Sequence, residues 1–250
     1  MASAAAAAGA VAVLAAVAAC AAAASLPLPS YIKACKMNDP NLNECSLKNG
    51  REAIPSILKG DPKYRVPSFD PLVLTEVSVA DRGLNITLRN VRLLGIPDID
   101  FRSSVIDLTG MKFIWGFFLP RLEVLSDYTV DGKILVLPLK GNGPANITLL
   151  DVPIILTFDY ELMKKDDGKE YLNPTKVTPS FNSTQVYIQL DNLFNGDKLL
   201  GDNTNKFLNE NWREVVADVG PVLAQGLAEA VRQILAGIAL QVPFHLLFTQ

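Results

Sequence analysis

The chain has 250 residues, of which 49% are hydrophobic and 20% are charged. This length corresponds to one large domain or two small ones, with enough residues to build a substantial core. The formal net charge is −3 at pH 7, from 23 basic and 26 acidic side chains. Because binding to a phosphate backbone requires an excess of basic residues, nucleic acid is not expected as a partner.

The N-terminus predicts a secretory signal peptide over residues 1–24. Small apolar residues without any charge extend from Ala10 to Ala24, and two prolines follow closely. This run is shorter than the roughly 20 residues that a helix needs to span a bilayer. A retained membrane anchor and a lipidated Cys20 are the alternative interpretations. We expect the remaining residues, 25–250, to form a single domain.

Two cysteines, Cys35 and Cys45, remain after the predicted signal peptide. An even pair in a secreted chain predicts one structural disulfide. A zinc site would need further ligands, and the single histidine, His245, lies far along the chain. A redox pair would prefer a Cys-x-x-Cys spacing. Neither a metal ion nor a cofactor is therefore expected.

Three Asn-x-Ser/Thr sequons, at Asn85, Asn146 and Asn182, predict glycosylation. Asn85 alternates with Leu84 and Ile86 along the chain. Because alternate residues of a strand face opposite sides, a glycan on Asn85 would point toward water. The sequons agree with a secreted protein.

Between Leu72 and Phe194 the apolar residues recur with a period of two, which predicts strands. Examples are Leu84, Ile86 and Leu88; Met111, Phe113, Trp115 and Phe117; and Val186, Ile188 and Leu190. The phase slips between Leu88 and Val91 and again around Asp151. A slip of one residue indicates a bulge, and bulges bend strands. We therefore predict a long, strongly curved antiparallel sheet.

Turn residues separate the predicted strands. They are Asp81–Gly83, Asp131–Gly132, Gly141–Pro144 and Asp166–Gly168. Asp-Gly between two apolar runs is typical of a two-residue hairpin turn, so Asp131–Gly132 is the best hairpin candidate.

Two helices are expected. A short helix is predicted over Cys45–Leu58 with Ser46 at its start, and a long one from Thr204 to about Ala239 with an interruption near Gly220–Pro221. The long helix is apolar around well over half of its circumference, which predicts burial on most sides. It is long enough to cross a membrane, but its charged and amide side chains argue against stable insertion. A buried helix covering a concave sheet gives an α+β fold.

Three segments of the sequence resemble one known family. The first joins the paired cysteines to Ile54–Gly60 and 66–72, the second is Tyr128–Pro138 with Gly141–Gly143 after it, and the third, the most specific, is Leu193–Val215. On these segments the chain resembles the insect takeout and juvenile-hormone-binding proteins from roughly Cys35 to Phe248. Its single cysteine pair makes it similar to the takeout branch.

The resemblance implies a long C-terminal helix wrapped by a highly curved antiparallel sheet that encloses a hydrophobic tunnel. It implies a secreted carrier in haemolymph whose partner is a hydrophobic small molecule: a juvenile-hormone-like terpenoid, a fatty-acid-like compound or a related lipid. Members of the family are linked to circadian rhythm, feeding behaviour and chemosensation. The stretch Pro243–Phe248 lacks the acidic residues common in the family, so the packing of the tail at one end of the tunnel is left open.

Candidate ligand-binding residues are the alternate apolar residues of the strands that we expect to face the long helix, together with residues of that helix. They are Phe113, Trp115, Phe117, Leu122, Val124, Tyr128, Leu156, Phe158, Val186, Leu227, Val231 and Ile234. Tyr128 is the expected polar contact for a ligand, because it places a phenol on an otherwise apolar phase. Ordinary core packing is the alternative for each of the twelve.

Catalysis is not expected. A Ser-His-Asp arrangement would have to recruit His245 from the C-terminal end, and Asp166 and Asp167 lie in a turn rather than forming an acid–base pair. Three hypotheses remain: a secreted carrier of a hydrophobic small molecule, an extracellular signalling protein that binds an unknown receptor and has a vestigial tunnel, and a lipid-modifying hydrolase that depends on His245.

Overall fold

The computed structural model describes residues 25–81 and 83–250. In chain order the elements are β1 (Cys35–Lys36), α1 (Leu42–Ile57), η1 (Pro62–Tyr64), β2 (Leu72–Asp81), β3 (Leu84–Leu94), η2 (Ile96–Asp98), β4 (Asp100–Asp107), β5 (Lys112–Ile134), β6 (Leu137–Lys164), β7 (Glu170–Phe181), β8 (Gln185–Leu190), η3 (Phe194–Gly196), α2 (Lys198–Glu210), α3 (Trp212–Ala239), α4 (Phe244–Leu247) and β9 (Phe248–Thr249). The predicted signal peptide, 1–24, lies outside the described residues.

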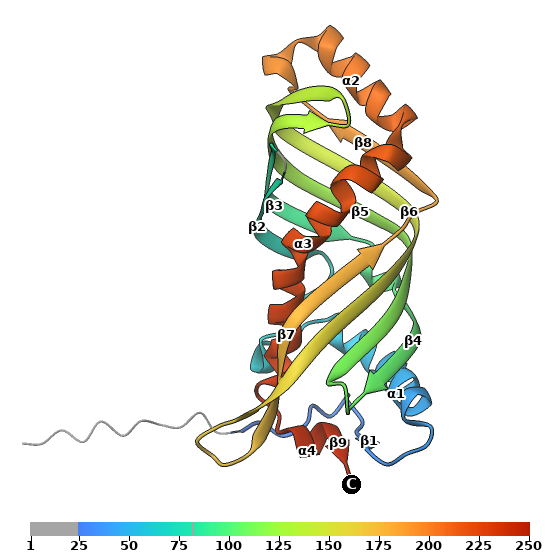
Figure 1. Cartoon of the computed structure of the whole chain (residues 1–250), viewed down its shortest axis with the longest axis vertical. Helices are drawn as coiled ribbons and strands as arrows, with labels where there is room; N and C mark the ends of the chain where they lie inside the picture. Colours follow the sequence, from blue (N-terminus) through green and yellow to red (C-terminus); the bar gives the residue numbers. More distant parts are fainter. Residues whose placement is uncertain (1–24, 82) are drawn as a thin grey trace, which may run out of the picture.

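The expected curved antiparallel sheet is present and has seven strands, in the order β2-β3-β5-β6-β7, with β4 paired to β5 and β8 paired to β6. β5 and β6 are so long that each pairs with two different strands, one after the other, along the same edge. β5 pairs with β3 in the part of the sheet that we call the upper half, and with β4 in the lower half. β6 likewise pairs with β8 in the upper half and β7 in the lower half. Figure 1 shows both halves curving around the long axis.

The two predicted slips of phase are both present. In β3 the register with β5 shifts between Arg89 and Arg92, and Asn90 between them has a φ of 52°. Such an irregularity bends a strand and increases its twist. Asn90 therefore marks one of the places where the sheet curves.

The second slip lies where the upper and lower halves meet, and it affects two strands together. Pairing of β5 with β6 passes from Leu119–Val152 to Arg121–Leu150, so that Pro120 and Asp151 leave the ladder opposite each other. Asp151 has a φ of 47°. Both strands are interrupted at opposite residues, so the pairing of β5 with β6 continues in the same register on either side. In each strand, however, the residues that face inward switch from one alternate set to the other.

The hairpin predicted at Asp131–Gly132 was wrong. β5 continues through these residues to Ile134, and the turn lies at Leu135–Val136. The Leu135 N–H donates to the Asp218 carboxylate of α3 at 3.0 Å, which fixes the turn against the helix. A Cβ on Gly132 would come within 2.4 Å of the Gly83 carbonyl oxygen, so this glycine allows close packing and not a turn.

The turn predicted at Gly141–Pro144 was also wrong, because these residues belong to β6 and pair with Asp127–Val130. A Cβ on Gly143 would lie 2.6 Å from the Asp191 carbonyl oxygen. The glycine therefore allows a neighbouring loop to pass close to the strand. The turns predicted at Asp81–Gly83 and Asp166–Gly168 do separate strands, β2 from β3 and β6 from β7.

The helices differ from the prediction at their ends. α1 begins at Leu42, earlier than the expected Cys45, and contains Pro55. The C-terminal helical region is interrupted at Asn211, between α2 and α3, and α3 continues through Gly220 and Pro221. The predicted interruption was therefore placed about nine residues too late.

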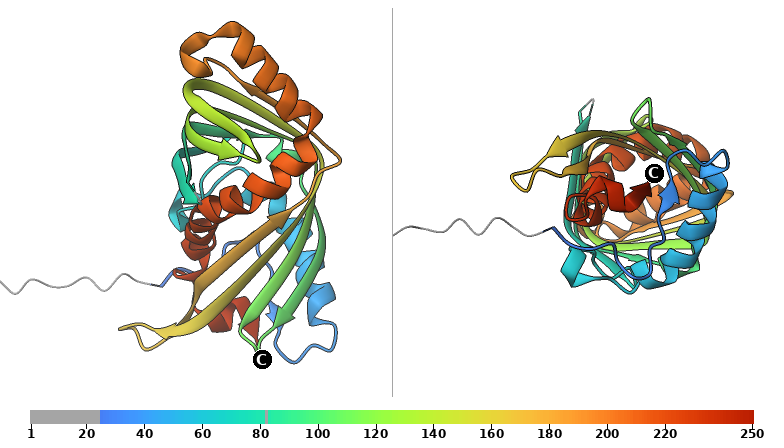
Figure 2. Two further views of the ribbon diagram at one scale, coloured as in Figure 1. Left: turned by 45° about the horizontal axis from the view of Figure 1, so that its top comes forward. Right: turned by 90° about the horizontal axis from the view of Figure 1, so that it is seen from below.

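α2 covers the edge strand β8 with two asparagines. The Asn205 side chain accepts from the Leu190 N–H and donates to the Leu190 carbonyl, both at 2.9 Å. Asn209 makes the same pair of contacts with Ile188, at 2.9 and 2.7 Å. The unpaired backbone of the edge strand is thus satisfied by side chains of the helix. Figure 2 shows α2 covering the upper end of the molecule.

α3 packs against both β2 and β7, the two ends of the main strand order. The sheet and this helix together form a closed ring when viewed from below (Figure 2). The helix was expected to be buried on most sides, but one stripe is exposed. It consists of Arg213, Ala217, Pro221, Gln225, Glu229 and Gln233, each four residues after the one before. By length and composition alone α3 is long and apolar enough to cross a membrane, but its remaining faces meet the sheet and the interior.

The lower end of the molecule is held by the two ends of the described chain. Cys35 and Cys45 form the predicted disulfide, which ties β1 to α1. β1 pairs in parallel with β9, so that Cys35 lies opposite Phe248. The Met37 N–H donates to the Thr249 carbonyl at 2.7 Å. The C-terminal tail is therefore docked against the disulfide segment (Figure 1).

Candidate ligand-binding cavity

A cavity of about 700 Å³ lies between the sheet and α3. All twelve predicted ligand-binding residues line this one cavity: Phe113, Trp115, Phe117, Leu122, Val124, Tyr128, Leu156, Phe158, Val186, Leu227, Val231 and Ile234. Its position follows from the alternation of the strands, because the apolar phase of each strand faces the concave side. The interior is therefore not filled solid by side chains.

The cavity is elongated along α3. Its lining residues on this helix run from Val215 to Ala239, a stretch of up to about 36 Å at 1.5 Å per residue. Leu227, Val231 and Ile234 are half-buried and not fully buried. Since these side chains line the cavity, their remaining accessible surface faces it.

The lower half of the cavity has an aromatic wall. We call Phe101, Phe113, Trp115, Phe117 and Phe158 the aromatic cluster; all five line the cavity. Phe113 stacks on Phe158 with centroids 4.8 Å apart, and Phe101 stacks on Phe117 at the same distance. The Trp115 ring meets Phe158 at 75° with a separation of 4.9 Å. Stacked and edge-to-face pairs of this kind stabilise by about 0.5–1.5 kcal/mol each beyond their burial.

The upper half of the cavity is lined mainly by aliphatic side chains. They include Ile86, Leu88, Val124, Val130, Ile147, Leu149, Val186, Ile188, Val215 and Val219. The change from aromatic to aliphatic lining accompanies the change of phase at Pro120 and Asp151. The two halves of the cavity therefore differ in chemistry as well as in the strands that build them.

Tyr128 lines the upper half, but its hydroxyl is not the free polar contact that was expected. It donates to the Asp191 carbonyl at 2.7 Å, and the residue is only 3% exposed. Burial, with the charge of Asp191 as a smaller cause, raises the pKa of Tyr128 to about 12. The strand pattern gave no sign of this bond, because its acceptor lies in the loop between β8 and η3. The phenol oxygen can still accept a hydrogen bond, so Tyr128 as a polar contact for a ligand stays a prediction.

Replacing Tyr128 with phenylalanine is expected to lower the free energy of unfolding by about 0.5–1.5 kcal/mol, because the hydrogen bond from the Tyr128 hydroxyl to the Asp191 carbonyl is lost. The affinity for an apolar ligand should not change. Since the folded pKa lies above the unfolded value of about 10, the wild type's advantage should be complete below about pH 10 and decline above it. Urea unfolding of both proteins at neutral and alkaline pH measures this difference, and a loss of ligand affinity in Tyr128→Phe would contradict it.

Three polar residues in the lining come from the N-terminal segment and were not anticipated. Lys33 precedes β1, and Ser46 and Asn49 lie on α1. Ser46 shares a hydrogen bond of 2.8 Å with Ser104 through their hydroxyls. They were not predicted, because the order of residues in this segment does not show which of them face the cavity.

Phe101 and Phe248 are further lining residues that were missed. Phe101 packs beneath α1, where a Cβ on Gly50 would come within 2.5 Å of its ring. Phe248 follows the short helix α4, and its ring lies 5.9 Å from Phe113. The C-terminal tail, whose packing the sequence left open, thus contributes to the lower wall of the cavity.

The residues considered for catalysis lie away from the cavity. His245 is exposed on α4, and Asp166 and Asp167 lie in the β6–β7 turn. The Asp167 carboxylate accepts from the Tyr171 hydroxyl at 2.6 Å, and this bond holds the pKa of Asp167 below its usual value. None of these three residues lines the cavity.

The three sequon asparagines, Asn85, Asn146 and Asn182, are all exposed. Asn85 lies in β3, opposite to the inward-facing Leu84 and Ile86 as the alternation predicted. Asn146 lies in β6 and donates to Glu123 at 3.1 Å. Their glycosylation stays a prediction.

A curved antiparallel sheet closed by one long helix around an apolar cavity defines a class of protein that binds hydrophobic small molecules. The chain belongs to the haemolymph juvenile hormone binding protein (JHBP) family, whose family model matches residues 12–249. This is a family of binding and carrier proteins, and not of enzymes.

Known relatives agree with this assignment. The chain is 29% identical over 231 residues to the circadian clock-controlled protein daywake of Drosophila melanogaster, with 88% of each chain covered. It is 28% identical, over the same length and coverage, to daywake of Drosophila yakuba. The crystal structure of Epiphyas postvittana Takeout 1 matches with a TM-score of 0.76 and 27% identity, over 88% of this chain and 100% of that one. The takeout-like fold inferred from the sequence is confirmed.

Proposed function

We propose that the protein is a secreted carrier that holds one elongated hydrophobic small molecule in the cavity between its sheet and α3. The observation that supports this proposal is the cavity itself, whose volume of about 700 Å³ lies within the usual range of roughly 300–1,000 Å³ for ligand sites. Its length along α3 favours a chain-like ligand such as a terpenoid or a fatty-acid-like compound.

Burial of apolar surface alone is sufficient for useful affinity. A ligand with about 15 buried carbons gains at most about 12 kcal/mol at roughly 0.8 kcal/mol per methylene. Association costs about 4 kcal/mol or more. The remainder, at most about 8 kcal/mol, corresponds to binding in the micromolar range without any catalytic group.

Secretion is supported by the Cys35–Cys45 disulfide, because disulfides persist in oxidising compartments. The exposed sequons and the haemolymph family point in the same direction. The daywake relatives are clock-controlled proteins, which supports the proposal that this protein also takes part in circadian physiology. Receptor binding with a vestigial tunnel is less favoured, because the cavity is not closed by side chains.

Tryptophan fluorescence provides the test. The chain has two tryptophans: Trp115 lines the cavity, whereas Trp212 is buried outside it. Titration with an apolar lipid is expected to change the Trp115 emission with a saturable, micromolar or tighter curve. Trp212→Phe should keep this response and Trp115→Phe should remove it.

A protein that keeps its folded circular dichroism spectrum but gives no response with any terpenoid or fatty-acid ligand would contradict the carrier proposal. Native mass spectrometry of the secreted protein gives an independent readout, since a carrier should retain lipid acquired in the producing cell.

A further inference from the structure

The polarity of the cavity lining is concentrated at one end. Tyr128 uses its hydroxyl within the wall, and the other side chains with hydroxyl, amide or ammonium groups among the lining residues are Lys33, Ser46 and Asn49. All three lie in or beside the disulfide segment, next to the lower, aromatic half. The cavity is therefore asymmetric, with an aliphatic upper end and a polar lower margin.

Lys33 lies where the cavity meets solvent. Its side chain is 66% exposed, and among the described residues that line the cavity it is the one that is exposed to solvent. It is also the one charged residue in that set. A lining residue that is itself open to water marks a mouth, and here the mouth carries an ammonium group that is paired with a carboxylate.

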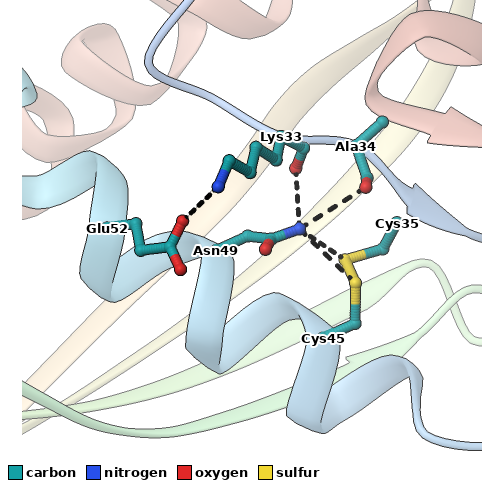
Figure 3. Close-up of polar contacts among 6 residues, drawn as sticks. All are labelled: Lys33, Ala34, Cys35, Cys45, Asn49 and Glu52. Atoms are coloured by element: carbon teal, nitrogen blue, oxygen red, sulfur yellow. Dashed lines mark hydrogen bonds and ion pairs between the residues drawn. A yellow bond between two sulfur atoms is a disulfide. The ribbon is translucent and has the colours of Figure 1, made fainter.

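The backbone around Lys33 is held by hydrogen bonds from α1. The Asn49 amide donates to the Lys33 carbonyl at 3.1 Å and to the Ala34 carbonyl at 3.4 Å. The Cys35–Cys45 disulfide ties the same segment to α1 (Figure 3). Asn49 is thus a positioning residue, which fixes where the lysine side chain begins.

The Lys33 ammonium contacts the Glu52 carboxylate of α1 at 2.5 Å (Figure 3). Both partners are open to water, with side chains 66% and 43% exposed. Exposed ion pairs of this kind stabilise by only about 0–1 kcal/mol. A second carboxylate can therefore replace Glu52 at little energetic cost, and Glu52 would remain solvated after the exchange.

We propose that Lys33 binds the carboxylate of a single-chain amphiphile, such as a fatty acid, at the lower mouth of the cavity. The ligand's hydrocarbon chain then runs past the aromatic cluster into the aliphatic upper half. Glu52 is the internal competitor for Lys33 and repels an anionic head group. This inference rests on the proposed carrier function and adds to it the chemistry and orientation of the ligand.

The test compares palmitic acid with methyl palmitate, which differ in the charge of the head group but share the same chain. Binding is followed by Trp115 fluorescence in the wild type, Lys33→Gln, Glu52→Gln and Lys36→Gln. Lys36 is an exposed lysine of β1 that does not line the cavity, and it serves as the matched control.

The wild type is expected to bind the acid up to about fivefold more tightly than the ester, the limit set by an ion pair open to water. Lys33→Gln should remove this preference by weakening the acid alone, Glu52→Gln should increase it, and Lys36→Gln should leave it unchanged. Equal binding of acid and ester by the wild type, or an acid preference that survives in Lys33→Gln, would overturn the assignment while leaving the carrier function intact. Failure of both lipids to bind the folded wild type would overturn the carrier function as well.

Discussion

Replacing Leu227 with tryptophan is expected to weaken the binding of a long lipid by at least about tenfold while leaving the fold intact. Leu227 is half-buried on α3 and lines the cavity. It packs with the core of the upper half, whereas Ala228 and Val231 pack with the core of the lower half. A tryptophan at this junction would extend into the cavity and separate its two halves.

The matched control is Gln225→Trp, which adds the same ring on the exposed stripe of the same helix. Its affinity for the lipid should equal that of the wild type, and substitutions at such exposed positions usually change stability by no more than about 0.5 kcal/mol. A short-chain lipid that fits one half should still bind to Leu227→Trp. Unchanged affinity for the long lipid in this variant would show that the ligand does not pass the junction.

Removing the disulfide by Cys35→Ala with Cys45→Ala is expected to lower the free energy of unfolding substantially. The two cysteines are 10 positions apart, and the chain-entropy model assigns about 2.7 kcal/mol to a loop of this size. Urea unfolding under oxidising conditions measures the loss. A decrease of less than about 1 kcal/mol would show that the unfolded chain is restricted without the cross-link.

The same variant should also loosen the C-terminal tail, because β9 pairs with β1 beside Cys35. Limited proteolysis is expected to cut near Phe248 sooner than in the wild type, and before the rest of the chain unfolds. Equal cleavage rates at the tail would show that the β1–β9 pairing persists without the disulfide.

The strands and the lining of the cavity were predictable because one physical rule determines both. Residues that alternate along a strand face opposite sides, so the apolar phase of β5 and β6 identified both the concave face and the cavity wall. The slips at Asn90 and Asp151 were visible for the same reason. The two-residue period of apolar side chains therefore predicted both the strands and the residues that line the cavity.

The turns at Asp131–Gly132 and Gly141–Pro144 were predicted wrongly because glycine is found both in turns and where two backbones pack closely. Gly132 and Gly143 stand where another backbone approaches within contact distance of the strand, and this approach is made by residues far away in the sequence. A local pattern of Asp-Gly or Gly-Asn-Gly is typical of a turn and does not contain that information.

Pro221 did not interrupt its helix, for a reason that the structure makes clear. A proline inside a helix leaves the carbonyl four residues earlier without a donor, here that of Ala217. Both residues belong to the exposed stripe of α3, so water is available to that carbonyl. Whether this proline interrupts the helix therefore depends on which face of the helix is exposed to solvent.

The sequence could not predict the polar lining residues Lys33, Ser46 and Asn49, because tertiary contacts determine where they lie. The disulfide and the Asn49 hydrogen bonds place this segment at the mouth of the cavity. No periodicity marks such residues, and their chemistry becomes informative only once the cavity is known.

The matched interruption at Pro120 and Asp151 has a consequence for how this architecture diversifies. Because the ladder on either side of it keeps its own register, substitutions that reshape the wall in one half need not be compensated in the other. For the proposed carrier, selectivity for the head of the ligand and tolerance for the length of its tail would then be set in different halves of the cavity.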